Sequence, residues 1–210
     1  LARSVPGQTV VSAAELEKIR RHVVRHQEAG GEWAWSSAPP NNRPPPFFES
    51  NEVATLLALL ALSDADSPMS DEVRDSRQKG IDWLAKADVT DTTQGAALRL
   101  LWKSRSQPAA DLQPDIERFF RRQRPDGGFG QLADRTSDAY ATGQALYLLN
   151  LVGVPRERDE VMRAVNFLAA TQRDDGSWPM TRRGHPGVEP GDFVVPITYF
   201  GSAWATLGLL

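Results

Sequence analysis

The residues best suited to acid chemistry are two aspartates in the segment Asp88-Val-Thr-Asp91. A carboxyl group can act as a general acid when neighbouring carboxylates and hydrogen bonds keep its proton in place. Paired carboxylates can also cleave glycosidic bonds, and the pairs available for that chemistry are Asp91 with Asp138 or with Glu49. The plainer interpretation is that Asp91, with the two threonines that follow it, caps the next helix.

Two histidines, His22 and His26, form a second candidate site. Their i, i+4 spacing places both on one face of a helix, which suits capture of a divalent metal. A metal site needs a third ligand, and the only other histidine is His185. We therefore interpret the pair as part of a solvated polar face, and we expect no metal and no other cofactor.

The segments that must position these residues follow a repeat. Three stretches align without gaps, and each has a glutamine, a glycine four residues later and an aromatic residue six residues later. The three sets are Gln27, Gly31 and Trp33; Gln123, Gly127 and Phe129; and Gln172, Gly176 and Trp178. The glycines supply the positive φ that ends a helix, the glutamine amide can satisfy orphan groups at a helix end, and the aromatic ring can cover the turn. These residues are predicted to be structural.

Each turn lies between two helical patterns. An amphipathic stretch precedes it, and a uniformly apolar stretch, typical of a helix buried on all sides, follows it. The amphipathic stretches fall at 16–23, 73–87, 116–120 and 161–168, and the apolar ones at 53–62, 96–102, 140–151 and 203–210. We predict an all-α protein with four outer and four inner helices. They form a single domain over residues 1–210, of which 1–12 are irregular.

The starts of the inner helices define a candidate ligand site. If all inner helices begin at the same end, their first residues surround one mouth of a cavity, and these are Glu49, Asn51, Asp91, Asp138, Thr198 and Tyr199. The aromatic candidates for the cavity wall are Tyr140, Tyr147 and Trp204. Acidic residues at helix N-termini are also favoured by the helix dipole, so capping is the plainer interpretation.

The Gln-x3-Gly-x-Trp turns resemble the QW motif of the squalene–hopene and oxidosqualene cyclases, and the helix pairs resemble those of protein prenyltransferase β-subunits. Segments 137–147 and 197–210 look like inner helices of that superfamily. The resemblance implies an α/α toroid, in which rings of inner and outer helices surround an apolar cavity. A full ring of that superfamily has more helix pairs than the four found here. We therefore expect an open ring, an undetected pair, or a chain that is part of a longer protein or of an oligomer.

The resemblance also gives the two aspartates a role. Hopene cyclases protonate a terminal alkene with an Asp-x-Asp-Asp motif that lies just before an inner helix. Residues 88–91 resemble that motif with Thr90 at the position of the central, proton-donating aspartate, and a threonine hydroxyl cannot protonate an alkene. Asp88 and Asp91 remain as candidate catalytic acids. The aromatic wall would stabilise carbocations through cation–π contacts in such an enzyme.

Composition excludes several function classes. The chain has no cysteine, which excludes disulfide scaffolds, thiol nucleophiles, the cysteine-ligated zinc of prenyltransferases and a thioester. Its net charge of −3 disfavours a broad nucleic-acid surface. The longest apolar run, 53–62, is too short to cross a bilayer. Nothing in the sequence indicates a compartment.

Three functions are compatible with these features. We expect a non-catalytic module that binds an apolar isoprenoid ligand or a protein partner, because the structural repeat is intact and the acid motif is not. One alternative is a terpenoid cyclase that uses Asp88 and Asp91 as its acid. Another is a carbohydrate-active α/α toroid.

Overall fold

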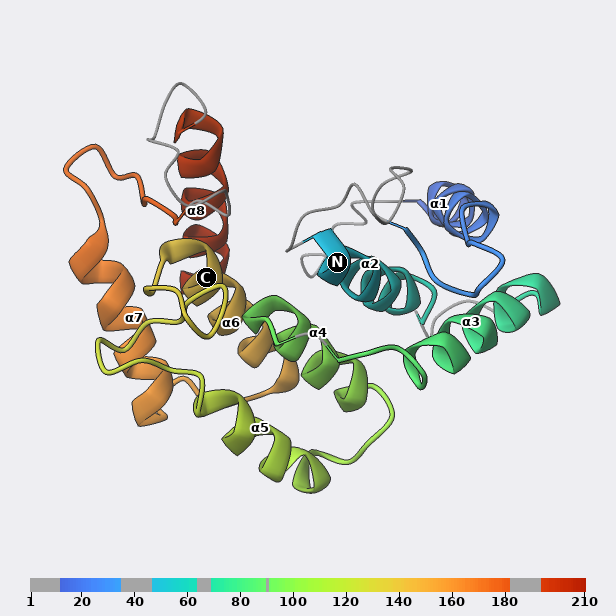
Figure 1. Ribbon diagram of the computed structural model, residues 1–210, viewed down its shortest axis with the longest axis horizontal. Helices are drawn as coiled ribbons and strands as arrows, with labels where there is room; N and C mark the ends of the chain where they lie inside the picture. Colours follow the sequence, from blue (N-terminus) through green and yellow to red (C-terminus); the bar gives the residue numbers. More distant parts are fainter. Residues whose placement is uncertain (1–11, 35–46, 64–68, 90, 182–193) are drawn as a thin grey trace. The chain divides into compact units, whose positions relative to one another are not determined.

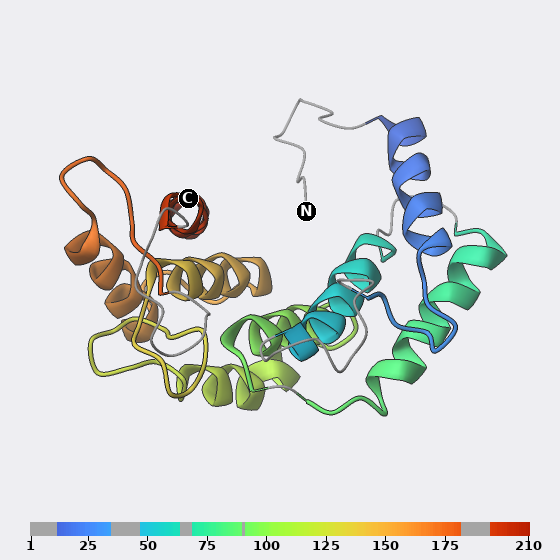
Figure 2. The same ribbon diagram turned by 45° about the horizontal axis from the view of Figure 1, so that its top comes forward.

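The computed structural model describes residues 12–34, 47–63, 69–89, 91–181 and 194–210 (Figures 1 and 2). Its α-helices are α1 (Ala13–Arg25), α2 (Phe47–Ala61), α3 (Asp71–Leu84), α4 (Thr93–Ser104), α5 (Gln113–Phe120), α6 (Ala139–Val152), α7 (Asp159–Thr171) and α8 (Val194–Leu209). A 3₁₀ turn, Ala109–Leu112, leads into α5. The described residues form no strand, only three isolated bridges between loops. The predicted all-α class is confirmed, with a helix at each expected outer and inner segment.

Side chains at the helix ends explain where several helices begin and stop. Ser12 and Glu15 form a reciprocal capping box at the start of α1, in which the Ser12 amide donates to the Glu15 carboxylate at 2.9 Å. Ser70 accepts from the backbone amide of Val73 at the start of α3. Gly153 ends α6 with a φ of 88°, a left-handed conformation that glycine adopts without steric cost.

Contacts divide the chain into two compact units, Leu1–Thr90 and Asp91–Leu210, and each is described by itself. The single domain over residues 1–210 stays a prediction. Within the described residues, no helix is long and apolar enough to cross a membrane.

In the first unit, α1 and α2 both pack on α3. The apolar helix α2 buries Leu56 and Leu59 almost completely. On α3, Gly80 allows close contact, because a Cβ at this position would lie 2.8 Å from the Trp33 ring and 3.1 Å from Leu59. A larger residue there would separate α3 from the first turn and from α2.

In the second unit, α6 is the central helix and contacts α4, α7 and α8, while α5 packs on α4. The contact between α6 and α8 depends on small residues. A Cβ on Gly143 would lie 2.3 Å from the Trp204 carbonyl, and a Cβ on Gly208 would lie 2.6 Å from the Gly143 carbonyl oxygen. The two backbones therefore approach more closely than larger side chains would allow.

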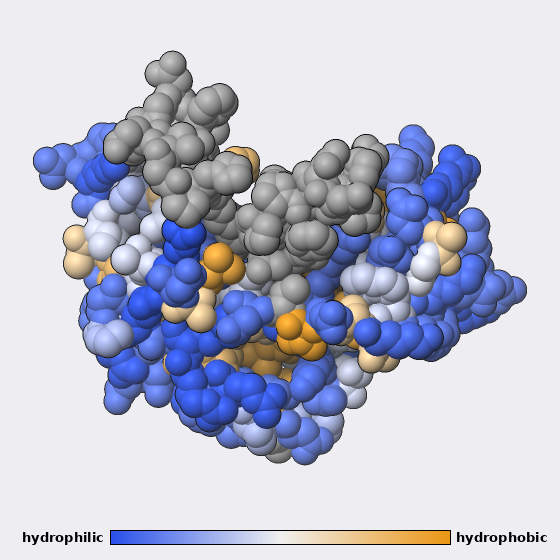
Figure 3. Space-filling model, in the orientation of Figure 1, coloured by the Kyte–Doolittle hydropathy of each residue, from blue (hydrophilic) through white to orange (hydrophobic). Residues whose placement is uncertain are grey.

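Hydrophilic residues dominate the described part of the surface in Figure 3. A few large apolar side chains are nevertheless exposed. Ile19 on α1 is 49% exposed, and Tyr199 and Phe200 on α8 are 71% and 60% exposed. Isolated exposed apolar residues of this kind are common on protein surfaces.

Candidate functional site

The three repeat turns have the same internal geometry. In each turn the glutamine Nε2 donates to the carbonyl oxygen of the glycine four residues later, and that glycine has a positive φ. The donor–acceptor distances are 2.7 Å for Gln27 and Gly31, 2.8 Å for Gln123 and Gly127, and 3.1 Å for Gln172 and Gly176. The glycine φ angles are 100°, 85° and 80°. The glutamine thus closes a turn that only glycine can form without strain.

The aromatic residue of each turn is tied to the apolar helix that follows. Its backbone amide donates to a hydroxyl on that helix, in the pairs Trp33 with Thr55 (3.0 Å), Phe129 with Thr142 (2.9 Å) and Trp178 with Ser202 (2.9 Å). The two indoles also donate to the preceding helix, to the carbonyls of Val23 and Leu168. A buried amide without a partner is costly, so this hydroxyl is part of what orients each turn on its helix.

The segment with the acid motif is divided between the two units. Thr92, not Asp91, is the N-cap of α4, and its side chain accepts from the Gly95 amide at 3.0 Å. Asp91 is exposed and accepts from the Arg122 guanidinium at 2.5 Å. This contact is a charge-assisted hydrogen bond near the surface of the second unit. Thr90 lies outside the described residues.

Asp138 caps α6 and is buried, with 4% of its surface exposed. Its carboxylate accepts four hydrogen bonds, from the amide of Ala141 (2.8 Å), the Gln131 side chain (2.6 Å), and both the amide (2.9 Å) and the hydroxyl (2.5 Å) of Thr181. These bonds occupy both carboxylate oxygens and fix the loop before α8 to the start of α6. The capping interpretation of Asp138 therefore agrees with its contacts.

The aromatic candidates for a cavity wall meet between α6 and α8. The Trp204 ring contacts Tyr140 and Tyr147 edge-to-face, with ring centroids 6.4 and 5.9 Å apart. Thr198 is half-buried, and Tyr199 is largely exposed. The side chain of Glu49 lies outside the described residues.

The larger cavity of the two described here, about 540 Å³, belongs to the first unit. It brings together two of the predicted site residues, Asn51 of α2 and Asp88 after α3. The remaining lining residues are Ala29, Gly30, Gly31, Glu52, Lys79, Asp82, Trp83, Lys86 and Ala87. Both charge signs are present, and Lys79, Asp82 and Trp83 lie on one face of α3. Asp88 is exposed at its edge.

A smaller cavity of about 210 Å³ lies between α6, α7 and α8. Most of its lining is aliphatic: Leu146, Leu149, Val154, Val161, Met162, Val165 and Leu209, with Gly208. Asn150 and Arg156 are its only polar lining residues. An apolar slot with a single cation suits the hydrocarbon part of a ligand.

The two histidines of the predicted pair lie next to each other at the C-terminal end of α1. His22 and His26 are exposed, their rings lie 4.1 Å apart, and His26 Nδ1 is 2.8 Å from the His22 carbonyl oxygen. No group of three metal-ligating side chains occurs in the part of the chain that the structure describes. His185 lies outside that part.

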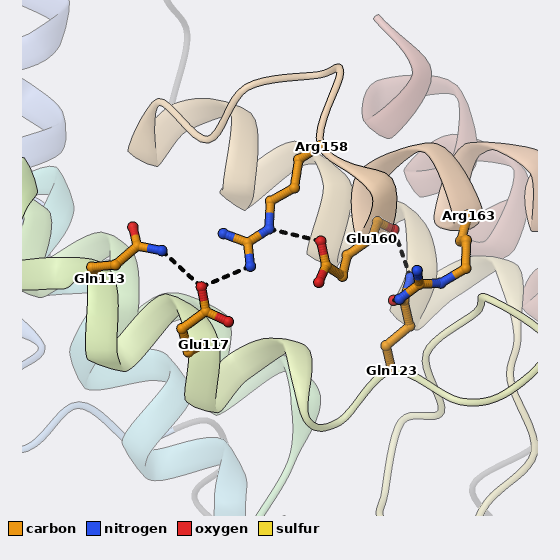
Figure 4. A network of polar contacts seen from close by, with 6 residues as sticks. All are labelled: Gln113, Glu117, Gln123, Arg158, Glu160 and Arg163. Carbon is orange, nitrogen blue, oxygen red and sulfur yellow. Dashed lines mark hydrogen bonds and ion pairs between the residues drawn. The ribbon is translucent and has the colours of Figure 1, made fainter.

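An ionic network joins α5 to α7 (Figure 4). The Arg158 guanidinium donates to the carboxylates of Glu117 and Glu160, each at 2.8 Å. These bonds lower the pKa of both carboxyl groups below the ordinary value of 4.5 and raise the pKa of Arg158. Arg158 also lies over the Phe120 ring, 4.4 Å from its centroid. The network holds the two outer helices together.

Sequence reasoning missed the contacts that depend on tertiary structure. The ion pair of Asp91 with Arg122 spans 31 residues, and no local pattern predicts it. The slot residues on α7, Val161 and Val165, belong to a pattern that we interpreted only as a packed face. The spacing of Lys79, Trp83 and Lys86 was visible in the sequence and could have suggested a helix face at a cavity.

No protein-family model matches the chain. It is 30% identical to a drimenyl diphosphate synthase from Streptomyces showdoensis, over 80% of this chain and 33% of that protein. It is 29% identical to a drimenyl diphosphate synthase from Streptantibioticus cattleyicolor, over 72% of this chain and 32% of that protein. The chain is related to terpenoid cyclases. It spans about a third of the length of these curated relatives, so the resemblance covers one part of each of them.

Proposed function

We propose that this chain is a terpenoid cyclase-like module that binds an apolar isoprenoid chain without supplying the acid that starts a cyclisation. Its binding site is the aliphatic slot between α6, α7 and α8. The observation that carries the proposal is the lining of this slot, in which aliphatic side chains from α6, α7 and α8 and from the loop after α6 face a common space. The α/α toroid and the QW-type role of the turns are part of the same proposal.

The size and lining of the slot favour a hydrocarbon tail. Its volume of about 210 Å³ is below the roughly 300 Å³ at which sites for drug-sized ligands begin, so it would hold part of an isoprenoid chain. Burial of each CH₂ group contributes about 0.8 kcal/mol, and the slot offers no hydrogen-bonding competitor along its aliphatic wall. Arg156 would face the polar end of such a ligand.

The contacts of the motif aspartates support the absence of protonation chemistry. Protonation of an alkene needs a carboxyl group that keeps its proton until the substrate arrives. Asp91 is exposed, and its side chain is already bonded to the Arg122 guanidinium. Asp88 is exposed to solvent, and the central position of the motif is Thr90.

A terpenoid cyclase is the second candidate, and the names of the two relatives favour it. In that case Asp88 and Asp91 would act as the acid. Turnover of squalene or of a shorter polyprenyl diphosphate by the purified chain, lost in Asp88→Asn and Asp91→Asn, would establish this function. Full activity in both variants would exclude the two aspartates. Among the described side chains, no contact favours the carbohydrate-active alternative, because Asp138 already has a full set of donors.

Organic extraction of the purified, folded chain followed by mass spectrometry tests isoprenoid binding. We expect a near-stoichiometric isoprenoid, or retention of added squalene when the chain is purified empty. Val165→Phe would fill the slot and remove that ligand. Val89→Phe is the matched control, because Val89 is 70% exposed and lines neither cavity. A chain that retains neither a native lipid nor squalene, or that binds equally well in both variants, would contradict the proposal.

A further inference from the structure

The cavity of about 540 Å³ in the first unit has no part in the proposed function. Its volume lies within the range of about 300–1,000 Å³ that is ordinary for ligand sites. Three of the charged residues that line it, Lys79, Lys86 and Asp88, form no hydrogen bond or ion pair with any residue in the described ranges. Both signs of charge are therefore available to a bound molecule.

The second unit contains the equivalent region, and equivalent hydrogen bonds define the alignment. The Gln27 Nε2 donates to the Ser76 carbonyl oxygen of α3 at 2.8 Å, and the Gln123 Nε2 donates to the Glu160 carbonyl oxygen of α7 at 2.6 Å. The second of these contacts is visible in Figure 4. The two helices can therefore be compared residue by residue from the bonded carbonyl onwards.

An aromatic ring closes this region in the second unit. Seven residues after the bonded carbonyl, α7 has Phe167, and a Cβ on Gly128 of the turn would lie 2.9 Å from its ring. The corresponding residue of α3 is Trp83, and the first turn has Glu32 where the second has Gly128. Because Glu32 has a Cβ, the Trp83 ring cannot pack on the turn as closely as Phe167 does. Trp83 is half-buried and lines the cavity instead.

The first turn also lacks a side chain that fastens the second. The Asp126 carboxylate accepts from the Gly128 amide at 3.0 Å and from the Ser137 hydroxyl at 2.8 Å, which ties the turn to the segment before α6. Gly30 occupies the equivalent position of the first turn and lines the cavity. The cavity thus lies where the second unit has a packed ring and a bonded carboxylate.

A further difference between the units frees a cation. The Arg163 guanidinium donates to Gln123 Oε1 at 2.8 Å, so α7 uses its cation to complete the turn (Figure 4). In the first unit the Ser76 hydroxyl donates to Gln27 Oε1, also at 2.8 Å. The turn therefore does not need Lys79, which is the counterpart of Arg163 and lines the cavity.

The free charges lie around the Trp83 side chain. Lys79 is four residues before Trp83, on the same face of α3. Lys86 follows the end of α3, in a turn where its backbone amide donates to the Trp83 carbonyl oxygen at 3.0 Å. Two ammonium groups suit the several oxygens of a phosphate, whereas an indole face and a carboxylate suit a positively charged nitrogen.

The balance of charge in the lining selects between types of ligand. Besides its two lysines, the cavity is lined by three acidic residues, Glu52, Asp82 and Asp88. A simple anion would therefore face a wall with a net negative charge, and a simple amine would leave both ammonium groups without a partner. A ligand that carries both charges matches the lining.

We propose that this cavity binds a zwitterion in which a phosphate ester and an ammonium group lie a few bonds apart, as in phosphocholine and phosphoethanolamine. Lys79 and Lys86 donate to the phosphate oxygens, and the ammonium group lies against the Trp83 ring and the Asp88 carboxylate. The proposal does not depend on the isoprenoid slot, because the slot belongs to the second unit.

Isothermal titration calorimetry of the full 210-residue chain with phosphocholine tests the site. We expect a dissociation constant of about 1 mM or lower, which is ordinary for a ligand of this size. Inorganic phosphate and choline should each bind at least about tenfold more weakly, because each offers one of the two charges. Co-sedimentation with phosphatidylcholine vesicles would identify a lipid headgroup as the source of the ligand, and binding of phosphocholine alone would identify a soluble one.

Substitutions locate the binding in this cavity. Lys79→Gln should weaken phosphocholine binding about tenfold, because it removes a charge-assisted hydrogen bond. Lys18→Gln removes the same charge from an exposed position of α1 that does not line the cavity, and it should have no effect. Trp83→Leu should weaken the binding of phosphocholine more than that of phosphate, because only phosphocholine has an ammonium group to lie on the ring.

Circular dichroism would verify that each variant is folded. The proposal would be overturned by a chain that binds no phosphocholine, or by one that binds inorganic phosphate as tightly as phosphocholine. Equal effects of Lys79→Gln and Lys18→Gln would also overturn it, because binding would then depend only on the net charge of the chain.

Discussion

Replacing the turn glutamines by alanine should have very unequal effects on stability, although their sequence contexts are the same. Gln123→Ala removes three hydrogen bonds, with Gly127 at 2.8 Å, with Glu160 at 2.6 Å and with Arg163 at 2.8 Å. Gln172→Ala removes one bond of 3.1 Å at an exposed position. The comparison is direct because both residues belong to the second unit and report on the same unfolding transition.

The size of the difference follows from the number and burial of these bonds. A net contribution of about 0.5–1.5 kcal/mol for each hydrogen bond gives a loss of about 2–3 kcal/mol for Gln123→Ala, which is part-buried. The loss for Gln172→Ala should be about 0.5 kcal/mol, because water replaces the single exposed bond. Gln27→Ala, in the first unit, should resemble Gln123→Ala, since Gln27 also bonds to its own turn and to the next helix.

Urea unfolding followed by circular dichroism measures these losses as shifts in midpoint at constant slope. Equal losses for Gln123→Ala and Gln172→Ala would refute the reasoning, because they would mean that the bond to the next helix contributes nothing.

Three other substitutions or conditions follow from the structure. Gly127→Ala should lower the melting temperature well beyond Gly153→Ala, because both residues have a positive φ but only at Gly127 would the Cβ meet a backbone carbonyl, at 2.6 Å. Gln144→Leu should stabilise the chain by about 1–2 kcal/mol in thermal unfolding, because the buried Gln144 amide has no hydrogen-bond partner among the residues that the structure describes. Unchanged stability would mean that this amide is bonded in solution. Arg158 lowers the pKa of Glu117 below 4.5 in the folded chain, so their ion pair stabilises the folded state fully above about pH 4.5. This stabilisation is lost as the pH falls through the lowered pKa of Glu117 in the folded chain. In the Arg158→Gln variant, the midpoint of urea unfolding should depend less on pH between about pH 6 and about pH 3. A pH dependence equal to that of the unaltered chain would exclude the contact of Arg158 with Glu117 as its cause.

The local features of the fold could be read from the sequence. The spacing of Gln123, Gly127 and Phe129 defines a turn by itself, because glycine supplies the conformation and the glutamine closes a loop of four residues. The amphipathic and apolar periods placed the helices correctly for the same reason, since both depend only on neighbours along the chain.

The features that sequence reasoning missed all involve partners distant in sequence. Nothing near Gln123 indicates that its amide also binds Glu160, 37 residues later. The cap of α4 was assigned to Asp91 together with the threonines, whereas Thr92 provides it and Asp91 binds Arg122. A short polar run offers several equivalent caps, and the choice among them depends on which side chain finds another partner.

The repeat turns and the helices that cover them are synthesised at different times. Two of the turns are completed by residues made later, 49 residues after Gln27 and 37 residues after Gln123. At about 5–20 residues per second, a ribosome needs about 2–10 s to supply them. During that interval the turn is already synthesised, but the side-chain amide of its glutamine lacks the carbonyl of the later helix and its glycine is not yet covered by that helix. We therefore expect each of these two turns to stay accessible to other molecules until its covering helix has been synthesised.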